Sequence, residues 1–94
     1  MRFELQFHSE ALREWKELDT TLREQFKTKL RERMENPRVP SAALSGMLNC
    51  YKIKLQRAGY RLVYRVDDNI VYVTVIAIGK RDKSDAYNKA RKRI

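Results

Sequence analysis

The beginning of the chain alternates in a way that predicts one strand followed by a helix. Over residues 2–7, apolar side chains lie at every second position between polar ones, which is the pattern of a half-buried strand. Ser9 comes next and is a suitable N-cap for a helix. Apolar residues then recur with helical spacing over 11–18. We therefore expect a strand over 2–7 and a helix that is interrupted at Asp19.

A second, longer helix is predicted from Thr21. Thr21 and Glu24 match the capping-box pattern, in which the two side chains bond each other's backbone amides. Four apolar side chains recur at every fourth position and share one side of the helix: Leu22, Phe26, Leu30 and Met34. Pro37 disfavours helical geometry in the residue before it, so the helix should end at about Asn36.

Beyond a loop at 38–48, the hydrophobic period changes from that of a helix to that of a strand. Two alternating segments, 51–55 and 60–66, are separated by a short turn at 56–59. After a second turn at 67–69, the next nine residues are apolar on both sides, as in a strand at the centre of a sheet. Three consecutive strands are therefore expected.

The last segment, from Gly79, is basic, and Ser84 is placed to cap a final short helix. The predicted order is β-α-α-β-β-β-α. These elements form an α+β fold in which an antiparallel meander sheet packs against an N-terminal helical hairpin. With 94 residues and neither linker nor repeat, the chain is expected to form a single domain over 1–94.

The register of the first hairpin is fixed by its apolar side chains. A shared buried face requires three pairs: Leu55 with Tyr60, Ile53 with Leu62, and Tyr51 with Tyr64. On the other face, Lys54 then lies opposite Arg61 and Lys52 lies opposite Val63. Directly opposed like charges destabilise a sheet by up to about 1 kcal/mol. Lysines that keep an edge strand soluble are one explanation, but they do not account for the arginine.

The charge balance indicates a polyanionic partner. The chain has 21 Lys and Arg against 12 Asp and Glu, a net charge of +9, which is typical of proteins that bind nucleic acid. The first 48 residues hold 9 basic and 8 acidic side chains, whereas the remaining 46 hold 12 and 4. A generally basic protein without such a partner is the alternative, and it explains this asymmetry poorly.

The composition also excludes several classes of protein. One cysteine and one histidine cannot form an internal disulfide or a zinc site, so no metal or other cofactor is expected. No apolar run approaches the ~20 residues that span a membrane, and the first residues do not resemble a signal peptide. We therefore expect a soluble, cytoplasmic protein that does not engage a membrane.

A second basic cluster follows the last predicted strand and consists of Lys80, Arg81 and Lys83. Because the last two strands are expected to pair, Arg81 can reach the side of the sheet that carries the first cluster. Tyr87 follows within two helical turns, and an aromatic ring among cations is typical of a site that binds phosphate and stacks a base. A core contact of the last helix is the alternative role for Tyr87.

These residues restrict the possible chemistry. The sequence has no standard nucleophile arrangement and no glycine-rich phosphate loop, so an acid, a base and an anion stabiliser would be Lys, Arg or Tyr. These residue types are sufficient for one reaction, the cleavage of RNA through attack by the RNA's own 2′-hydroxyl, because the nucleophile then belongs to the substrate. A lysine acts as a base only when neutral, and a neighbouring cation favours the neutral form. The pairing of Lys54 with Arg61 provides such a neighbour.

The sequence resembles the RelE mRNA interferases, which are toxins of the RelE/ParE toxin–antitoxin superfamily. The resemblance spans essentially the whole chain and rests on these segments: ALREW at 11–15, CYKIKL at 50–55, GYRLVY at 59–64, GKR at 79–81, and Tyr87. It implies a RelE-like fold and metal-independent, ribosome-dependent cleavage of mRNA in the A site, which inhibits translation.

The resemblance also implies roles for individual side chains. Lys52 and Lys54 match the family's strand lysines, with Lys54 as the expected general base. Arg61 matches the arginine that stabilises the pentacovalent phosphate, and Arg81 matches the general acid or leaving-group stabiliser. Tyr87 matches the aromatic that stacks on the substrate nucleotide.

The implied partners are mRNA, the ribosome and a cognate antitoxin. The antitoxin would wrap the toxin, block or displace its last helix, and bind operator DNA on behalf of the complex. Ribosomal RNA contacts would fall on the basic face of the second helix and around the cleft, at Arg23, Lys27, Lys29, Arg31, Arg33, Lys80 and Lys83. Where the family has an arginine in the loop before the second strand, this chain has Ser45, which puts one phosphate or rRNA contact in doubt.

Two other functions remain open at this stage. One is a non-enzymatic, ParE-like toxin of the same fold that inhibits gyrase by binding, which would not need the set of Lys54, Arg61, Arg81 and Tyr87. The other is a simple basic RNA-binding module, which would have neither toxicity nor an antitoxin.

Overall fold

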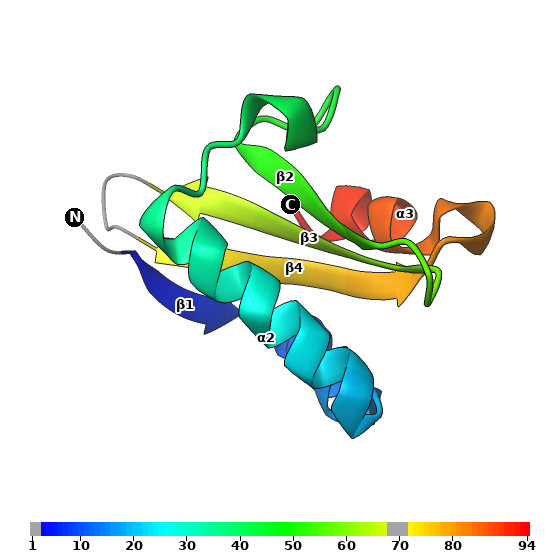
Figure 1. Cartoon of the computed structure of the whole chain (residues 1–94). Coiled ribbons are helices and arrows are strands. Elements are labelled where there is room, and N and C mark those ends of the chain that lie inside the picture. The colour runs from blue at the N-terminus through cyan, green and yellow to red at the C-terminus, as the bar shows by residue number, and fades with distance from the viewer. Residues whose placement is uncertain (1–2, 68–71) are drawn as a thin grey trace.

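A four-stranded sheet with helices on both faces organises the computed structural model, which describes residues 3–67 and 72–94 (Figure 1). The predicted order of elements is confirmed. The elements are β1 (Glu4–Phe7), α1 (Ser9–Glu17), α2 (Thr20–Glu35), β2 (Cys50–Leu55), β3 (Tyr60–Asp67), β4 (Tyr72–Lys80) and α3 (Asp85–Arg93). Short 3₁₀ turns lie at Pro40–Ala42, within the predicted loop, and at Asp82–Ser84.

The sheet has the strand order β1-β4-β3-β2. β2, β3 and β4 form the predicted antiparallel meander. β1 departs from that description because it pairs with β4 in parallel, from Glu4 opposite Tyr72 to Phe7 opposite Val75. A parallel neighbour requires a long crossover, and the helices and two strands between β1 and β4 supply it. β4 is therefore a central strand, as its apolar residues predicted.

The predicted register of the first hairpin is confirmed. Leu55 pairs with Tyr60, and Lys54 lies opposite Arg61 in the antiparallel ladder. The chain reverses at Gly59, whose φ of 69° favours glycine, and whose amide donates to the Leu55 carbonyl at 2.9 Å. The second predicted turn begins at the end of β3, but its residues 68 and 69 and the next two lie outside the described residues.

The two faces of the sheet are covered by different helices. α1 and α2 cover one face, where Phe26 and Leu30 pack against side chains such as Leu62. α3 covers the other face, where Ala86 and Ala90 are buried. Figure 1 shows α2 in front of the sheet and α3 behind it. The largest fully buried side chains, in order of volume, are those of Tyr64, Phe26, Ile53, Leu62 and Ile76.

The helix ends differ from the predicted caps. α1 is capped by His8, whose Nδ1 accepts from the Glu10 amide at 3.2 Å, and Ser9 is already helical. Asp19, in extended geometry, caps α2 by accepting from the Leu22 amide at 2.9 Å. Asp is as good an N-cap as Ser or Thr, so the aspartate two residues earlier takes the place of Thr21.

The other helix boundaries agree more closely with the sequence. α2 ends at Glu35 with Asn36 as its C-cap, in front of Pro37, as predicted. Ser84 stands at the predicted N-cap of α3, but its φ of 53° is left-handed and its side chain makes no capping hydrogen bond. Ser84 is also the last residue of the 3₁₀ turn that leads from β4 into α3.

Tyr64 anchors the end of α2 to the sheet. Its ring is fully buried and stacks on Tyr51 with ring centroids 5.6 Å apart. Its hydroxyl donates to the Pro37 carbonyl at 2.6 Å and accepts from Arg33 Nη1 at 2.9 Å. Burial raises the pKa of Tyr64, and the bond from Arg33 opposes that rise. Arg33 also donates to the Lys52 carbonyl at 3.1 Å, so α2 is tied to β2 as well.

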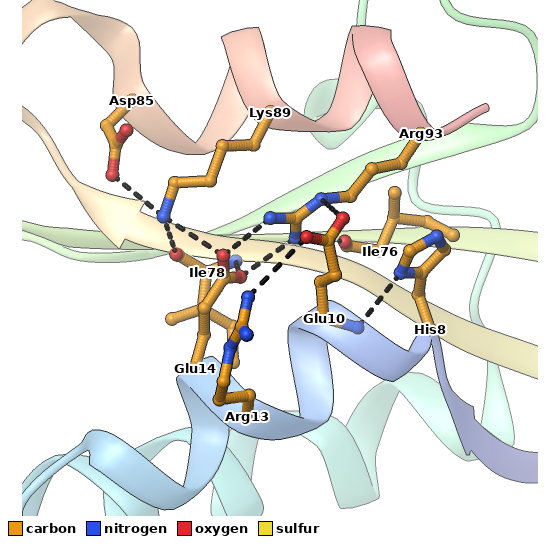
Figure 2. Close-up of polar contacts among 9 residues, drawn as sticks. All are labelled: His8, Glu10, Arg13, Glu14, Ile76, Ile78, Asp85, Lys89 and Arg93. Carbon is orange, nitrogen blue, oxygen red and sulfur yellow. Dashed lines mark hydrogen bonds and ion pairs between the residues drawn. The ribbon is translucent and has the colours of Figure 1, made fainter.

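Side chains complete the outer edge of β4, which continues beyond the last residue of β1 (Figure 2). Glu14 Oε1 accepts from the Ile78 amide at 3.0 Å. Lys89 Nζ donates to the Ile78 carbonyl, and Arg93 Nη1 donates to the Ile76 carbonyl, both at 3.0 Å. Buried backbone groups need such partners, and here α1 and α3 provide what a further strand would have provided.

Glu14 also binds the side chains of Lys89 and Arg93 directly. Glu14 Oε2 lies 2.7 Å from Arg93 Nη2 and 3.2 Å from Lys89 Nζ. We call Glu14, Lys89 and Arg93 the Glu14 clamp. The side chains of Glu14 and Arg93 are only 15% and 10% exposed, so this ion pair is largely shielded from solvent.

The charges within the Glu14 clamp stabilise each other. Burial alone would raise the pKa of Glu14. The bonds from Arg93, the Ile78 amide and Lys89 together lower the pKa by more than burial raises it, so it lies below its ordinary value of 4.5. The bond to Glu14 raises the pKa of Arg93. The Glu14 carboxylate and the Arg93 guanidinium are therefore charged at neutral pH.

In the part of the chain that the structure describes, no helix is both long enough and apolar enough to cross a bilayer.

The Tyr64 anchor predicts a stability loss for Tyr64→Phe. The variant keeps the ring but removes one acceptor of the Arg33 guanidinium and the donor to the Pro37 carbonyl, which should lower the free energy of unfolding by about 1–3 kcal/mol. Urea denaturation measures this loss in the free energy of unfolding. Tyr51→Phe is the matched control, since its hydroxyl accepts a longer bond of 3.3 Å from Arg38 and should cost less. Equal losses in the two variants would contradict the anchor.

The Glu14 clamp predicts an acid-dependent contribution to stability. Because the folded pKa of Glu14 is lowered, its contribution is complete above pH 4.5 and is lost as the pH falls through the folded pKa. Unfolding free energies of the wild-type chain and of Glu14→Gln should therefore differ by a constant amount near neutral pH. Their difference should shrink below pH 4.5. A difference that does not change with pH would count against a charged clamp.

Candidate active site

A small cleft at the turn end of the β2–β3 hairpin, which we call the cationic cleft, gathers three of the predicted catalytic side chains. Lys54, Arg61 and Arg81 all line it, and its volume is about 220 Å³. The three residues come from β2, β3 and the turn after β4. The structure therefore brings together cations that are far apart in the sequence, and no carboxylate lines the same cleft.

Backbone pairing explains how each cation reaches the cleft. The hairpin register sets Lys54 opposite Arg61, and the next pair of strands sets Arg61 opposite Gly79. Arg81 is then held by its own backbone, because its amide donates to the Gly59 carbonyl at 2.6 Å. The turn that follows β4 is thus fastened to the turn that joins β2 and β3. The sheet, rather than contacts among the side chains, fixes the cluster.

Tyr87 reaches the cluster from α3. Its hydroxyl accepts a hydrogen bond from Arg61 Nη1 at 2.8 Å, and Arg61 Cζ lies 5.4 Å from the ring centroid. The ring also packs against the core beneath α3. The core contact that the sequence suggested for Tyr87 is therefore present, and the same ring lies beside a cation of the predicted site. The bond leaves the guanidinium of Arg61 with further N–H groups that can donate to an anion.

Lys52 stands apart from the cleft. It lies on the same face of β2 as Lys54, opposite Val63, and its side chain is half-buried. Two residues of a strand span about 6.6 Å, and Lys52 does not line the cleft. The geometry thus separates the two strand lysines, because Lys54, the expected general base, lines the cleft and Lys52 does not.

The basic residues of α2 lie on the other face of the sheet from the cleft. Four of them, Arg23, Lys27, Lys29 and Arg31, are exposed or half-exposed on the helix surface. Two of these have partners within the chain: Arg23 donates to the Lys16 carbonyl, and Lys27 pairs with Glu24. Arg33 is directed inward, to Tyr64 and to the Lys52 carbonyl. The expectation that Arg33 contacts RNA is therefore corrected: its guanidinium is used by the fold.

The two further lysines assigned to RNA contacts follow the last strand. Lys80 is exposed at the end of β4, opposite Tyr60, and borders a second cleft of about 580 Å³ between α1 and α3. The backbone of Lys83 belongs to the 3₁₀ turn before α3, and nothing further is described of its side chain. Unlike the cationic cleft, the second cleft is lined by four carboxylates, those of Glu14, Glu17, Asp82 and Asp85.

Sequence reasoning missed the neutral residues of the cationic cleft. Gln56, Gly59 and Tyr60 also line it. They lie in and beside the hairpin turn. The predicted turn could have indicated these residues, because it joins the two strands that carry Lys54 and Arg61.

Neither cysteine nor histidine contributes to the site. Cys50 is buried beneath α3, and this burial raises the pKa of its thiol, as suits a packing role. His8 caps α1. Within residues 3–67 and 72–94, no three His, Cys, Asp or Glu side chains come together in a group that could hold a metal ion.

Known proteins resemble this chain over its full length. The family model described as the ParE toxin of the type II toxin–antitoxin system parDE matches residues 5–84. The mRNA interferase toxin RelE of Escherichia coli strain K12 is 52% identical over 94 residues, which are all of this chain and 99% of that protein.

Solved structures agree with the sequence comparison. A doubly substituted E. coli toxin RelE in the free state has a TM-score of 0.92 and 51% identity, covering 100% of this chain and 99% of that one. The same toxin variant in complex with an antitoxin RelBc peptide has a TM-score of 0.83, with the same identity and coverage. The resemblance drawn from the sequence is thereby confirmed, and the chain belongs to the RelE/ParE family of type II toxin–antitoxin toxins.

Proposed function

We propose that this chain is a ribosome-dependent endoribonuclease toxin that cleaves mRNA in the ribosomal A site. The observation that carries the proposal is the convergence of Lys54, Arg61 and Arg81 on one cleft, with Tyr87 bonded to Arg61. Proteins about half identical to the chain are named mRNA interferases, which supports the same reaction.

In the proposed reaction, the 2′-oxygen of the mRNA attacks the adjacent phosphorus. Lys54, as the general base, accepts the proton of the 2′-hydroxyl from its position opposite Arg61 in the ladder. Arg61 donates to the phosphoryl oxygens, which carry extra negative charge in the pentacovalent state. The bond from phosphorus to the 5′-oxygen then breaks, leaving a 2′,3′-cyclic phosphate and a 5′-hydroxyl.

Arg81 and Tyr87 complete the proposed site. Arginine keeps its proton in proteins, so Arg81 stabilises the leaving 5′-oxygen by charge and hydrogen bonding, while water supplies the proton. The ring of Tyr87 stacks on a base beside the scissile phosphate. Lys52 lies outside the cleft on the same face of the sheet, and we assign to it an auxiliary contact with the RNA backbone.

Dependence on the ribosome follows from how little of the RNA this cleft could hold. The cleft offers cations for one phosphate, and Tyr87, bonded to Arg61, offers a ring beside them for a base. In-line attack requires the 2′-oxygen, the phosphorus and the 5′-oxygen to be aligned, and such alignment is a large part of catalysis. We propose that the ribosome supplies the alignment by holding the mRNA.

Ribosomal RNA is the proposed partner of the basic residues that remain. Arg23, Lys27, Lys29 and Arg31 on α2 would contact one rRNA segment, and Lys80 and Lys83 would contact RNA beside the cleft. Ser45 replaces an arginine of the family, so the loop before β2 would contribute less. Because ribosomes are its target, the chain would act in the cytoplasm.

An antitoxin is the proposed protein partner. E. coli RelE has been solved in an intact RelBE toxin–antitoxin complex and with an antitoxin peptide. By analogy, a cognate antitoxin would cover this chain, block or displace α3, and attach the complex to operator DNA.

The name of the matching family model favours a second candidate, a ParE-like toxin that inhibits gyrase by binding. This candidate requires neither mRNA cleavage nor a cationic cleft. Intact mRNA together with inhibited DNA supercoiling would establish it and exclude the nuclease.

The nuclease proposal predicts a large effect of Arg81→Ala. Toe-printing of mRNA on programmed ribosomes should show A-site cuts with the wild-type chain, and the variant should cut about 100- to 1,000-fold more slowly. Arg13→Ala is the matched control, because Arg13 is an exposed arginine on α1, away from the cleft. Comparable cutting by Arg81→Ala and Arg13→Ala would exclude the proposed role of Arg81.

The geometry also predicts an order of effects for the two strand lysines. Lys54→Ala should lower the cleavage rate by about 100- to 10,000-fold, since it removes the general base. Lys52→Ala should lower it less, because Lys52 does not line the cleft. Single-turnover cleavage rates on programmed ribosomes measure both. The reverse order would assign the base to Lys52.

A further inference from the structure

We propose that Glu14 is a positioning residue for the nuclease, acting through α3 to hold Tyr87 against Arg61; the inference rests on the function proposed above. Glu14 lies on α1 and does not line the cationic cleft. Its bonds to Lys89 and Arg93 hold one flank of α3, while Tyr87 extends from the other flank.

The helical positions of these residues make the two flanks dependent on each other. Ala86 and Ala90 face the sheet and are buried. Successive residues of a helix are about 100° apart, so Tyr87 lies to one side of this buried line, and Lys89 lies to the other. A rotation of α3 that loosens the clamp therefore moves the hydroxyl of Tyr87 relative to Arg61.

The other end of α3 is held by close packing, as Gly79 shows. A Cβ atom at Gly79 would lie 3.0 Å from the Ala86 amide nitrogen and nearer still to the Asp85 carboxylate. The first turn of α3 thus rests directly on β4. The Glu14 clamp holds the later turns of the same helix (Figure 2), so the packed end and the clamp together set how far α3 can rotate about its axis.

The clamp is suited to this purpose because it is rigid. Glu14 uses both oxygens, and its partners include the Ile78 amide of the sheet itself. Lys89 is also paired with Asp85 at 3.0 Å, which links the clamp to the packed end of α3. Catalytic groups lose about 100-fold in rate when displaced by about 1 Å, so a modest movement of Tyr87 is sufficient to matter.

The first test compares Glu14→Gln with Glu17→Gln in cleavage on programmed ribosomes. Glu17 is an exposed carboxylate on the same helix, so its variant changes the charge equally. We expect Glu14→Gln to lower kcat by about 10- to 100-fold, with KM for ribosomes unchanged, and Glu17→Gln to resemble the wild type. An unchanged kcat, or a loss confined to KM, would overturn the inference.

A double variant separates positioning from a loss of folded protein. In a Tyr87→Ala background there is no tyrosine left to position, so adding Glu14→Gln should lower kcat no further. A general defect in folding would instead multiply with the loss due to Tyr87→Ala. Arg93→Gln breaks the clamp from the α3 side while leaving the bond from the Ile78 amide to Glu14, and it should reproduce the kcat loss of Glu14→Gln.

A measurement without ribosomes distinguishes failure of this inference from failure of the proposed function. The NMR signals of the Tyr87 ring and of the Arg61 guanidinium should shift in Glu14→Gln and stay in place in Glu17→Gln. If these shifts appear but the wild-type chain cuts no mRNA, the link between Glu14 and Tyr87 stands and the proposed nuclease function is wrong. Unchanged signals in Glu14→Gln would overturn the link, whatever the activity of the wild-type chain.

Discussion

The register of the β2–β3 hairpin is the constraint on which the site depends. One face of the hairpin is apolar and must be buried under α1 and α2, which fixes the pairing of Leu55 with Tyr60. A slip by one residue would expose that apolar face. The same pairing sets Lys54 opposite Arg61 on the other face. The hydrophobic core thus enforces a like-charge pair that is unfavourable for the sheet and suitable for binding a phosphate. Stability and the proposed activity are connected through this register.

The last helix, α3, contributes Tyr87 to the site although few of its side chains are buried in the core. α3 has nine residues and buries mainly two alanines. Such a short helix is marginal by itself, so its placement relies on the carboxylate of Glu14 and on the free backbone groups of β4. An element held mainly by polar contacts at one end can be displaced more easily than a core strand. This arrangement is consistent with a helix that both completes the site and can be displaced by a partner.

Much of the fold could be predicted because its signals are local. Alternation of polar and apolar residues located the strands, Pro37 ended α2, and parity gave the hairpin register. Other features depend on contacts that no local pattern records. The parallel pairing of β1, the inward direction of Arg33 and the burial of Glu14 each arise where segments distant in sequence meet. For the site, the sequence brought Lys54 and Arg61 together by register, whereas the separation of Lys52 from the cleft required coordinates.

The central claim is that three cations from separate elements surround one scissile phosphate, and it can be observed directly. The decisive measurement is a structure of this chain on programmed ribosomes whose A-site mRNA carries 2′-O-methyl groups and cannot be cut. The expected result is that the side chains of Lys54, Arg61 and Arg81 lie within hydrogen-bond distance of a single phosphate, with Tyr87 against an adjacent base. A complex in which the mRNA lies along α2, with this cleft empty of phosphate, would contradict it.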